Sequence, residues 1–330
     1  MNELLKTEHL SVSFFTDAGE VEAVRDVSFT VEKGEVLAIV GESGCGKSAL
    51  CKSIMKLLPK TAKIKSGKIL VNGADITDYT EKNMSRLRGE LFSMVFQDPM
   101  TFLNPVLRIQ TQLIEPIINH NPGISKKEAI ERAIELMRKV GIPSPETRIR
   151  QYPFQFSGGM RQRIIIAIAL ACDPKLIIAD EPTTALDVTI QAQVLELISN
   201  LKDEIDSSII MITHDLGVVA SICDRIAIMY GGKIVEEGTT DEIFYEPKHP
   251  YTKGLLSCIS NPEELERKEL HPIPGSPPDL LNIENNCPFA DRCEHAMKVC
   301  KMAMPQAEKF SETHFCSCWL NHPYAQGKGV

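Results

Sequence analysis

The eight residues from Gly41 to Ser48 constrain the fold of this chain more than any other segment. They read Gly-Glu-Ser-Gly-Cys-Gly-Lys-Ser and match the pattern of a phosphate-binding P-loop. An apolar run at 36–40 precedes them, and the segment 49–55 that follows is typical of a helix. In such a strand–loop–helix arrangement, loop N–H groups and the helix N-terminus point at phosphate oxygens. The sequence therefore predicts a P-loop inside an α/β fold.

The chemistry of the loop residues predicts nucleotide and magnesium binding. Lys47 can reach the β- and γ-phosphates, and the hydroxyl of Ser48 can ligate Mg²⁺. The residues expected to contact the nucleotide are Gly41, Glu42, Ser43, Gly44, Cys45, Gly46, Lys47, Ser48 and Ala49.

Two acidic residues follow the apolar run at 176–179. A strand beside the P-loop strand would carry Asp180 to the Mg²⁺ held by Ser48. Glu181 would then lie where a water attacks the γ-phosphate and could act as its general base. Alone, two acids after a strand indicate a helix N-cap region, and the upstream P-loop reverses that preference.

Composition excludes several classes of protein. The chain has 330 residues and a net charge of −8, which argues against a general nucleic-acid binder. We expect no signal peptide, because the N-terminus lacks a long apolar core, and no apolar stretch reaches the length of a membrane span. We therefore expect a soluble chain whose membrane role, if any, comes through a partner.

The order of apolar and helical segments predicts two domains. Continuous apolar runs at 91–96, 176–179 and 209–213 alternate with helical patterns, which favours a mainly parallel sheet. The helical stretch 99–170 is expected to be an inserted subdomain. Proline and cysteine become frequent after residue 246, so we expect domains at 1–245 and 246–330, the second small and irregular.

The segment Ser157-Gly158-Gly159-Met160-Arg161-Gln162-Arg163 reads either as a simple helix N-cap or as a second anion-binding helix terminus. It resembles the signature sequence of ATP-binding cassette (ABC) proteins, with methionine where most members have glutamine. The resemblance implies that Ser157, Gly158 and Gly159 cover the γ-phosphate bound to the P-loop of a partner. It also implies an antiparallel β subdomain beside the parallel core.

Four further residues resemble elements of the same family. Gln97 resembles the glutamine that touches Mg²⁺ and couples to the transmembrane partner, and Asp187 lies in a loop that crosses the dimer interface. His214 resembles the switch histidine at the γ-phosphate. Phe14 is expected to stack on adenine, although its alternation with Val12 also fits a plain core residue.

Three C-terminal segments narrow the resemblance. Residues 249–256, 273–280 and 287–293 resemble the ATPase subunits of bacterial dipeptide and oligopeptide importers, whose relatives carry nickel or other small solutes. In some of these subunits C-terminal cysteines bind a [4Fe–4S] cluster, and the matching positions are Cys287, Cys293, Cys300 and Cys318. Their spacing leaves tetrahedral Zn²⁺ and free thiols open. Cys316 is interpreted as a bystander.

The resemblance predicts an ATP-hydrolysing subunit that powers peptide import from the cytoplasmic face of the membrane. It implies a second, related ATPase subunit in a heterodimer, two permease subunits and an extracellular binding protein. The alternatives are the ATPase of a nickel or other small-solute importer, a soluble ABC ATPase of translation or DNA repair, and a P-loop kinase or GTPase. A kinase or GTPase would lack Ser157-Gly158-Gly159.

Overall fold

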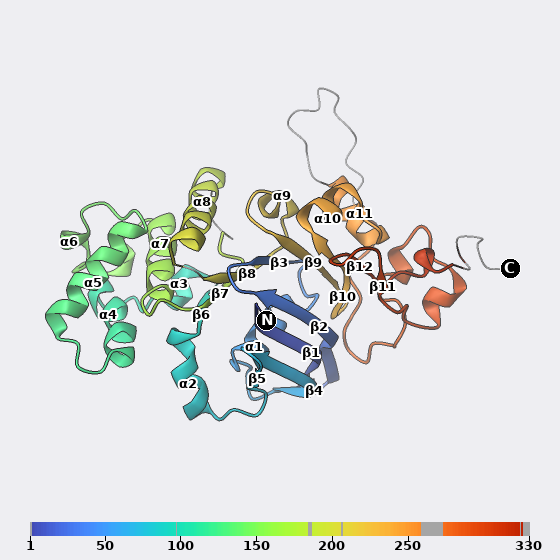
Figure 1. The fold of residues 1–330 in the computed structure, drawn as a ribbon, viewed down its shortest axis with the longest axis horizontal. Helices are drawn as coiled ribbons and strands as arrows, with labels where there is room; N and C mark the ends of the chain where they lie inside the picture. Colours follow the sequence, from blue (N-terminus) through green and yellow to red (C-terminus); the bar gives the residue numbers. More distant parts are fainter. Residues whose placement is uncertain are drawn as a thin grey trace, which may run out of the picture.

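The strands of this chain form two sheets that pack against each other. The structure is a computed structural model that describes residues 2–96, 98–183, 187–205, 207–258, 273–323 and 325. Within these residues, a four-stranded antiparallel sheet lies against an eight-stranded central sheet (Figure 1). The antiparallel sheet has the order β2 (Gly19–Glu32), β1 (Glu3–Thr16), β4 (Ala62–Val71) and β5 (Ala74–Asp75). The central sheet has the order β11 (Glu308–Lys309), β12 (Phe315–Cys316), β10 (Lys233–Thr239), β9 (Arg225–Tyr230), β3 (Val36–Val40), β8 (Ser208–Thr213), β7 (Leu176–Asp180) and β6 (Phe92–Val95).

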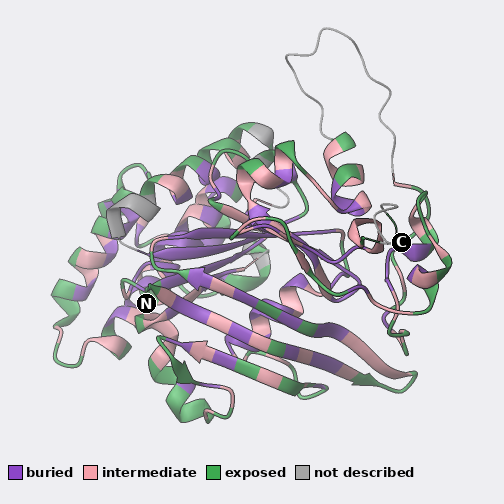
Figure 2. Ribbon diagram, turned by 45° about the vertical axis from the view of Figure 1, so that its right-hand side comes forward, coloured by how far each residue is buried: buried purple, intermediate pink, exposed green. Residues whose placement is uncertain are grey.

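The middle of the central sheet is parallel and buried on both faces. Strands β9, β3, β8, β7 and β6 run parallel, while β10 and β12 are antiparallel to their neighbours. Alternate residues of β3 enter two different cores: Ala38 packs with the helices, and Ile39 packs with the antiparallel sheet. Figure 2 shows these strands as the most buried part of the chain. The continuous apolar runs of the sequence follow from this double burial.

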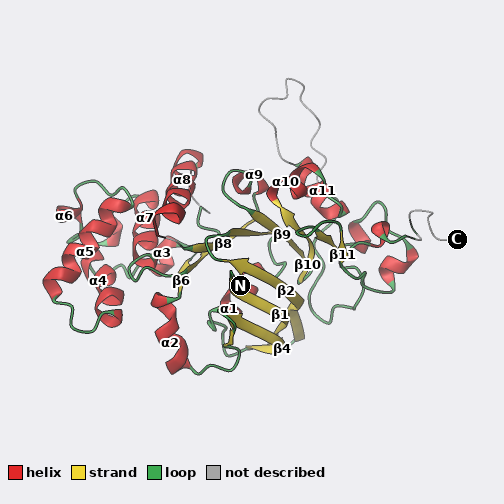
Figure 3. Cartoon of the chain, viewed as in Figure 1, coloured by secondary structure: helices red, strands yellow, loops and turns green. Residues whose placement is uncertain are grey.

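Helices cover the two faces and extend one end of the molecule. Helix α1 (Lys47–Ile54) shares the core of the antiparallel sheet through Leu50 and Ile54. The helices that lie between residues 99 and 170 are grouped at the left-hand end of Figure 3. They are α3 (Pro99–Phe102), α4 (Ile109–His120), α5 (Lys126–Lys139), α6 (Pro145–Arg148), the 3₁₀ turn η1 (Pro153–Gln155) and α7 (Gly158–Ala169). The remaining helices of the cassette are α2 (Glu81–Glu90), α8 (Val188–Ile205), α9 (Leu216–Val219) and α10 (Thr240–Tyr245).

Local chemistry explains where these helices begin. Ser125 and Glu128 form a reciprocal capping box at the start of α5, and Ala129, Ala133, Leu136 and Met137 place one face in the core.

The C-terminal segment is irregular and packs on the end of the central sheet. It contains α11 (Pro250–Ser257) and the 3₁₀ turns η2 (Ala290–Arg292), η3 (Lys298–Lys301) and η4 (Trp319–Asn321). Strand β12 pairs with β10, so this segment extends the sheet of the cassette. None of the helices that the structure describes is long and apolar enough to cross a membrane.

Candidate functional site

The predicted site residues gather where three parallel strands end. The P-loop follows β3, Asp180 and Glu181 stand at the end of β7, and His214 follows β8. Because β8 lies between β3 and β7 and all three run parallel, their carboxyl ends meet at one edge of the sheet. Ligands of open α/β folds bind at this kind of edge.

The P-loop wraps closely around its own backbone. Gly46 caps α1 with a φ of 106°, and a Cβ at this position would lie 2.0 Å from the carbonyl oxygen of Ala23. Only glycine therefore fits there. Lys47 is 4% exposed and donates from Nζ to the carbonyl oxygens of Gly41 and Glu42, at 2.7 and 2.9 Å. The loop thus places a lysine ammonium at the N-terminus of a helix, an arrangement that suits a phosphate chain.

A hydrogen bond joins the P-loop helix to strand β7. Ser48 Oγ donates to Asp180 Oδ1 at 2.9 Å. Asp180 is 4% exposed, and burial raises the pKa of its carboxyl above the usual range. A hydroxyl and a carboxylate oxygen that converge in this way are the donors that Mg²⁺ prefers. We expected β7 to be adjacent to the P-loop strand, but β8 lies between them, and α1 reaches β7 by crossing beneath β8.

Glu181 and His214 face each other at the same edge. Glu181 Oε1 lies 3.5 Å from Nδ1 of His214. The histidine side chain is 62% exposed and that of Glu181 is 16% exposed. Glu181 has a φ of 45°, an uncommon conformation for a residue with a side chain, while its N–H donates to Ile212 O at 3.0 Å. A carboxylate and an imidazole that meet beside a phosphate-binding loop can together orient a water and handle its proton.

The signature segment forms the exposed start of α7. Ser157 Oγ accepts the N–H of Met160 at 3.3 Å, so the serine caps the helix. Ser157 and Gly158 are exposed, whereas Gly159 is buried against α8, where an added Cβ would lie 2.4 Å from Cγ2 of Ile190. Capping of α7 by the Ser157 hydroxyl does not exclude contact between this segment and a second subunit, because Ser157 and Gly158 remain exposed.

The other family positions are less completely described. Asp187 Oδ1 accepts the N–H of Ile190 at 3.0 Å and caps α8, while Gln97 lies outside the described residues. Phe14 in β1 is half-buried and pairs with Val21. The next residue, Phe15, is 41% exposed and lies under the ammonium groups of two lysines.

The prediction of an iron–sulfur cluster held by the C-terminal cysteines is wrong. Among the described residues, no group of three or more His, Cys, Asp or Glu side chains is arranged to hold a metal ion, so the zinc alternative falls with it. Cys287 and Cys300 belong to the main hydrophobic core, and Cys293 packs against it. Burial raises the pKa of Cys287 to about 12 and that of Cys318 to about 11. Burial thus favours the neutral thiol over the thiolate at both positions.

Sequence reasoning missed two residues that contact the P-loop. Tyr251 accepts the N–H of Glu42 at 2.9 Å, and Arg292 pairs with its carboxylate at 2.5 Å. Tyr251 and Arg292 both lie in segments that the sequence analysis used only for their resemblance to peptide-importer ATPase subunits. A nearly buried arginine requires a carboxylate partner, but the sequence does not say which one.

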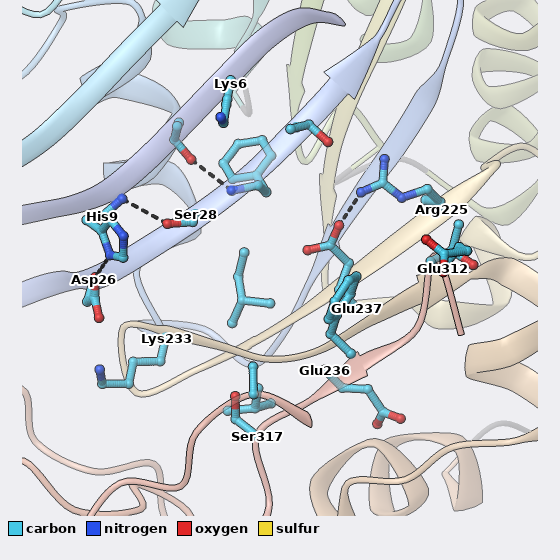
Figure 4. A pocket seen from close by; sticks show the side chains of 18 of the residues that line it. Lys6, His9, Asp26, Ser28, Arg225, Lys233, Glu236, Glu237, Glu312 and Ser317 are labelled. Atoms are coloured by element: carbon cyan, nitrogen blue, oxygen red, sulfur yellow. Dashed lines mark hydrogen bonds and ion pairs between the residues drawn. The ribbon is translucent and has the colours of Figure 1, made fainter. Parts of the chain in front are cut away.

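A large hollow formed by described residues lies away from the P-loop. Strands β1, β2, β9 and β10 and the C-terminal segment form its walls (Figure 4). Arg225 at its wall donates to Glu35 at 2.6 Å and to Glu237. No P-loop residue lines it.

This fold and this site define a P-loop ATPase of the ATP-binding cassette class. Residues 24–184 match the model of the ABC transporter family, and residues 235–300 match the model described as the oligopeptide/dipeptide transporter C-terminal region. The chain is similar in structure to the dimeric, post-hydrolysis cassette MJ0796 bound to ADP and phosphate, at a TM-score of 0.65 and 27% identity, over 72% of this chain and 99% of that one. It is also similar to cbiO1 of Clostridium perfringens, part of a transporter complex, at a TM-score of 0.64 and 29% identity, over 74% of this chain and 92% of that one.

Full-length relatives identify the family. The chain is 53% identical to the oligopeptide transport ATP-binding protein OppD of Bacillus subtilis, over 98% of this chain and 91% of that one. It is 52% identical to the dipeptide transport ATP-binding protein DppD of the same organism, over 99% and 97%. The OppD of Escherichia coli is 46% identical, over 96% and 93%. This chain belongs to the ABC transporter family and, within it, to the ATP-binding subunits of oligopeptide and dipeptide transporters.

Proposed function

We propose that this chain hydrolyses ATP to power the import of dipeptides or oligopeptides through a membrane ABC transporter. The observation that carries the proposal is the Ser48–Asp180 hydrogen bond, which joins a P-loop to the acidic end of β7 in a chain half identical to peptide-transport ATP-binding proteins. No described feature favours a nickel importer or a non-transport ATPase.

Each predicted residue has a specific task in this proposal. The phosphates lie along Gly41–Ala49, with Lys47 at the β- and γ-phosphates, and Phe14 stacks on the adenine. Ser48, Asp180 and Gln97 would hold Mg²⁺, and the hydroxyl and carboxylate oxygens of the first two fit that ion. Bound Mg²⁺ would neutralise charge on the phosphate oxygens.

The proton chemistry belongs to Glu181 and His214. Glu181 orients the attacking water and takes its proton. His214 contacts the γ-phosphate and also the carboxylate of Glu181. The 3.5 Å separation supports this pairing, because it brings both groups within reach of one water.

The exposed signature supports a sandwich of two subunits. Ser157, Gly158 and Gly159, with Asp187, would contact the nucleotide held by the P-loop of a second ABC subunit. We propose that this partner is a related chain in a heterodimer. Two permeases, which also receive substrate from an extracellular binding protein, would hold the pair at the cytoplasmic face of the membrane. Nucleic acid has no part in this assembly.

We also propose that the chain divides near residue 245. Residues 1–245 would form the nucleotide-binding domain, with its helical subdomain at about 99–170, and residues 246–330 would form a small domain typical of peptide importers. The irregular 3₁₀ turns after α11 support this division.

Substitution of Glu181 tests the proposal directly. In the chain assembled with its permeases, we expect Glu181→Gln to keep MgATP binding and to lower steady-state phosphate release by a factor of about 10²–10⁴, the usual contribution of a general base. Peptide uptake should fall in parallel. Glu131→Gln, on the exposed face of α5, is the matched control and should change neither.

Two further outcomes decide the substrate and the reaction. Unchanged phosphate release by Glu181→Gln would rule out Glu181 as the base. Normal ATP turnover without stimulation by peptide-loaded binding protein, but with stimulation by a nickel-loaded one, would rule out peptide import.

A further inference from the structure

The second residue of the P-loop is held by residues more than 200 positions later in the chain. Tyr251, on α11, accepts the backbone N–H of Glu42 at 2.9 Å. Arg292, at the end of η2, donates from Nη1 to Oε2 of Glu42 at 2.5 Å and from Nη2 to Oε1 at 3.0 Å. This two-point pairing of guanidinium and carboxylate fixes the direction of both groups. The loop is therefore attached to the C-terminal segment through both its backbone and its side chain.

All five N–H groups of Arg292 have a defined acceptor. Besides the two oxygens of Glu42, Nη1 donates to the hydroxyl of Tyr230 at 3.0 Å, Nε donates to Pro274 O at 2.7 Å, and Nη2 donates to Ile273 O at 3.3 Å. The side chain is 7% exposed. A guanidinium with every donor satisfied has one orientation, so it presents a fixed positive charge to the loop.

A cluster of aromatic rings packs beside the guanidinium of Arg292. Tyr230 ends β9 and is fully buried, and its ring centroid lies 4.4 Å from that of Tyr251 and 5.2 Å from that of Phe289. The guanidinium carbon of Arg292 lies 5.8 Å above the ring of Tyr230. The pairing with Glu42 is thus built on the central sheet and is not a flexible surface contact.

The negative charge of Glu42 lies in the phosphate-binding loop, where it needs a counter-charge. Its side chain is 26% exposed and belongs to a loop that accommodates a triphosphate, and its carbonyl oxygen accepts from Lys47 Nζ at 2.9 Å. An unpaired carboxylate there would repel the phosphates and compete for the lysine. With Arg292 in place, that carboxylate is neutralised and turned toward the C-terminal segment.

We propose that Arg292 is a positioning residue of the nucleotide site, through which the C-terminal segment sets the affinity of the P-loop for a nucleoside triphosphate. Arg292 acts through Glu42 and has no contact with the reacting atoms. The inference rests on the proposed function, because it assumes that MgATP binds at this loop.

A double-mutant cycle on the full chain tests the proposal, with MgATP binding measured by titration calorimetry. Arg292→Ala should raise the Kd about tenfold, which corresponds to about 1.4 kcal/mol. In the Glu42→Gln background the same substitution should raise it less than about twofold, since the charge to be neutralised is gone. Arg150→Ala, at an exposed arginine of the helical subdomain, is the matched control.

The outcomes separate two roles for Arg292, namely positioning of Glu42 and stabilisation of the fold alone. Equal increases of Kd in both backgrounds would show that Arg292 acts only through the fold and would overturn the proposal, as would an unchanged Kd for Arg292→Ala. If Arg292→Ala does not fold, Arg292→Gln removes the charge but keeps a long polar side chain, and an unchanged Kd for that variant would overturn the proposal. A wild-type chain that binds no MgATP would instead refute the proposed function itself.

Discussion

Two alanine substitutions in the same loop separate backbone strain from steric collision. Gly44 and Gly46 both have left-handed backbones, with φ of 81° and 106°. An alanine in such a conformation costs about 1–2 kcal/mol. A Cβ at Gly44 meets nothing within 4 Å, but at Gly46 it lies 2.0 Å from the backbone oxygen of Ala23 and 2.9 Å from Cε of Met229. The strand that carries Ala23 must therefore shift, which adds about 1–3 kcal/mol.

We expect Gly44→Ala to lower the free energy of unfolding by about 1–2 kcal/mol and Gly46→Ala by about 2–5 kcal/mol. Urea denaturation of the full chain, followed by far-ultraviolet circular dichroism, measures both values. MgATP binding should also fall more for Gly46→Ala, because the helix N-terminus is displaced. Equal losses of stability in the two variants would refute the steric argument and leave only the backbone strain.

Three further predictions concern ionisable side chains outside the P-loop, and the urea midpoint of unfolding measures each. Burial lowers the pKa of His249 to about 3, so the unfolded chain takes up the proton first and stability should fall as pH drops from 6.5 to 3. His249→Asn should flatten that decline, and an identical profile would contradict the assignment. Burial alone would raise the pKa of Glu242, but hydrogen bonds, led by those from the Ser311 hydroxyl and the Thr239 backbone N–H, lower it to about 2. Glu242→Gln should therefore be less stable at pH 7 and should approach wild type as pH falls from 4.5 to 2, whereas a constant difference would argue against it. Arg225→Met leaves two mostly buried glutamates unpaired and should cost about 3–5 kcal/mol. A loss below 1 kcal/mol would mean that these acids are solvated.

The parts of the fold that the sequence predicted are those buried on both faces. The apolar runs at 36–40, 176–179 and 209–213 correspond to β3, β7 and β8 within one residue at each end. Strand β1 extends from Glu3 to Thr16, and its first residues alternate polar and apolar side chains only weakly, so the sequence pattern does not mark where it begins. The order of strands in the sheet could not be read in this way, since the insertion of β8 between β3 and β7 depends on tertiary packing.

The residues of the candidate site also fall into those that the sequence predicted and those that it did not. Ser48 and Asp180 were paired in advance because both belong to short motifs whose chemistry requires a common ion. The cysteine prediction failed because spacing alone does not tell whether Cys287 and Cys300 face a metal or a hydrophobic core. The pairing of Glu42 with Arg292 spans 250 residues, and neither residue carries a local signal for the other.

That separation along the chain has a consequence for biosynthesis. Ribosomes add about 5–20 residues per second, so about 12–50 seconds pass between the synthesis of Glu42 and that of Arg292. During this interval the residues of the loop have been synthesised, but the acidic second residue has no counter-charge from Arg292. A nascent subunit therefore reaches its final nucleotide affinity only when nearly the whole chain has been made, and a chain that stops short of residue 292 would remain a weak competitor for ATP.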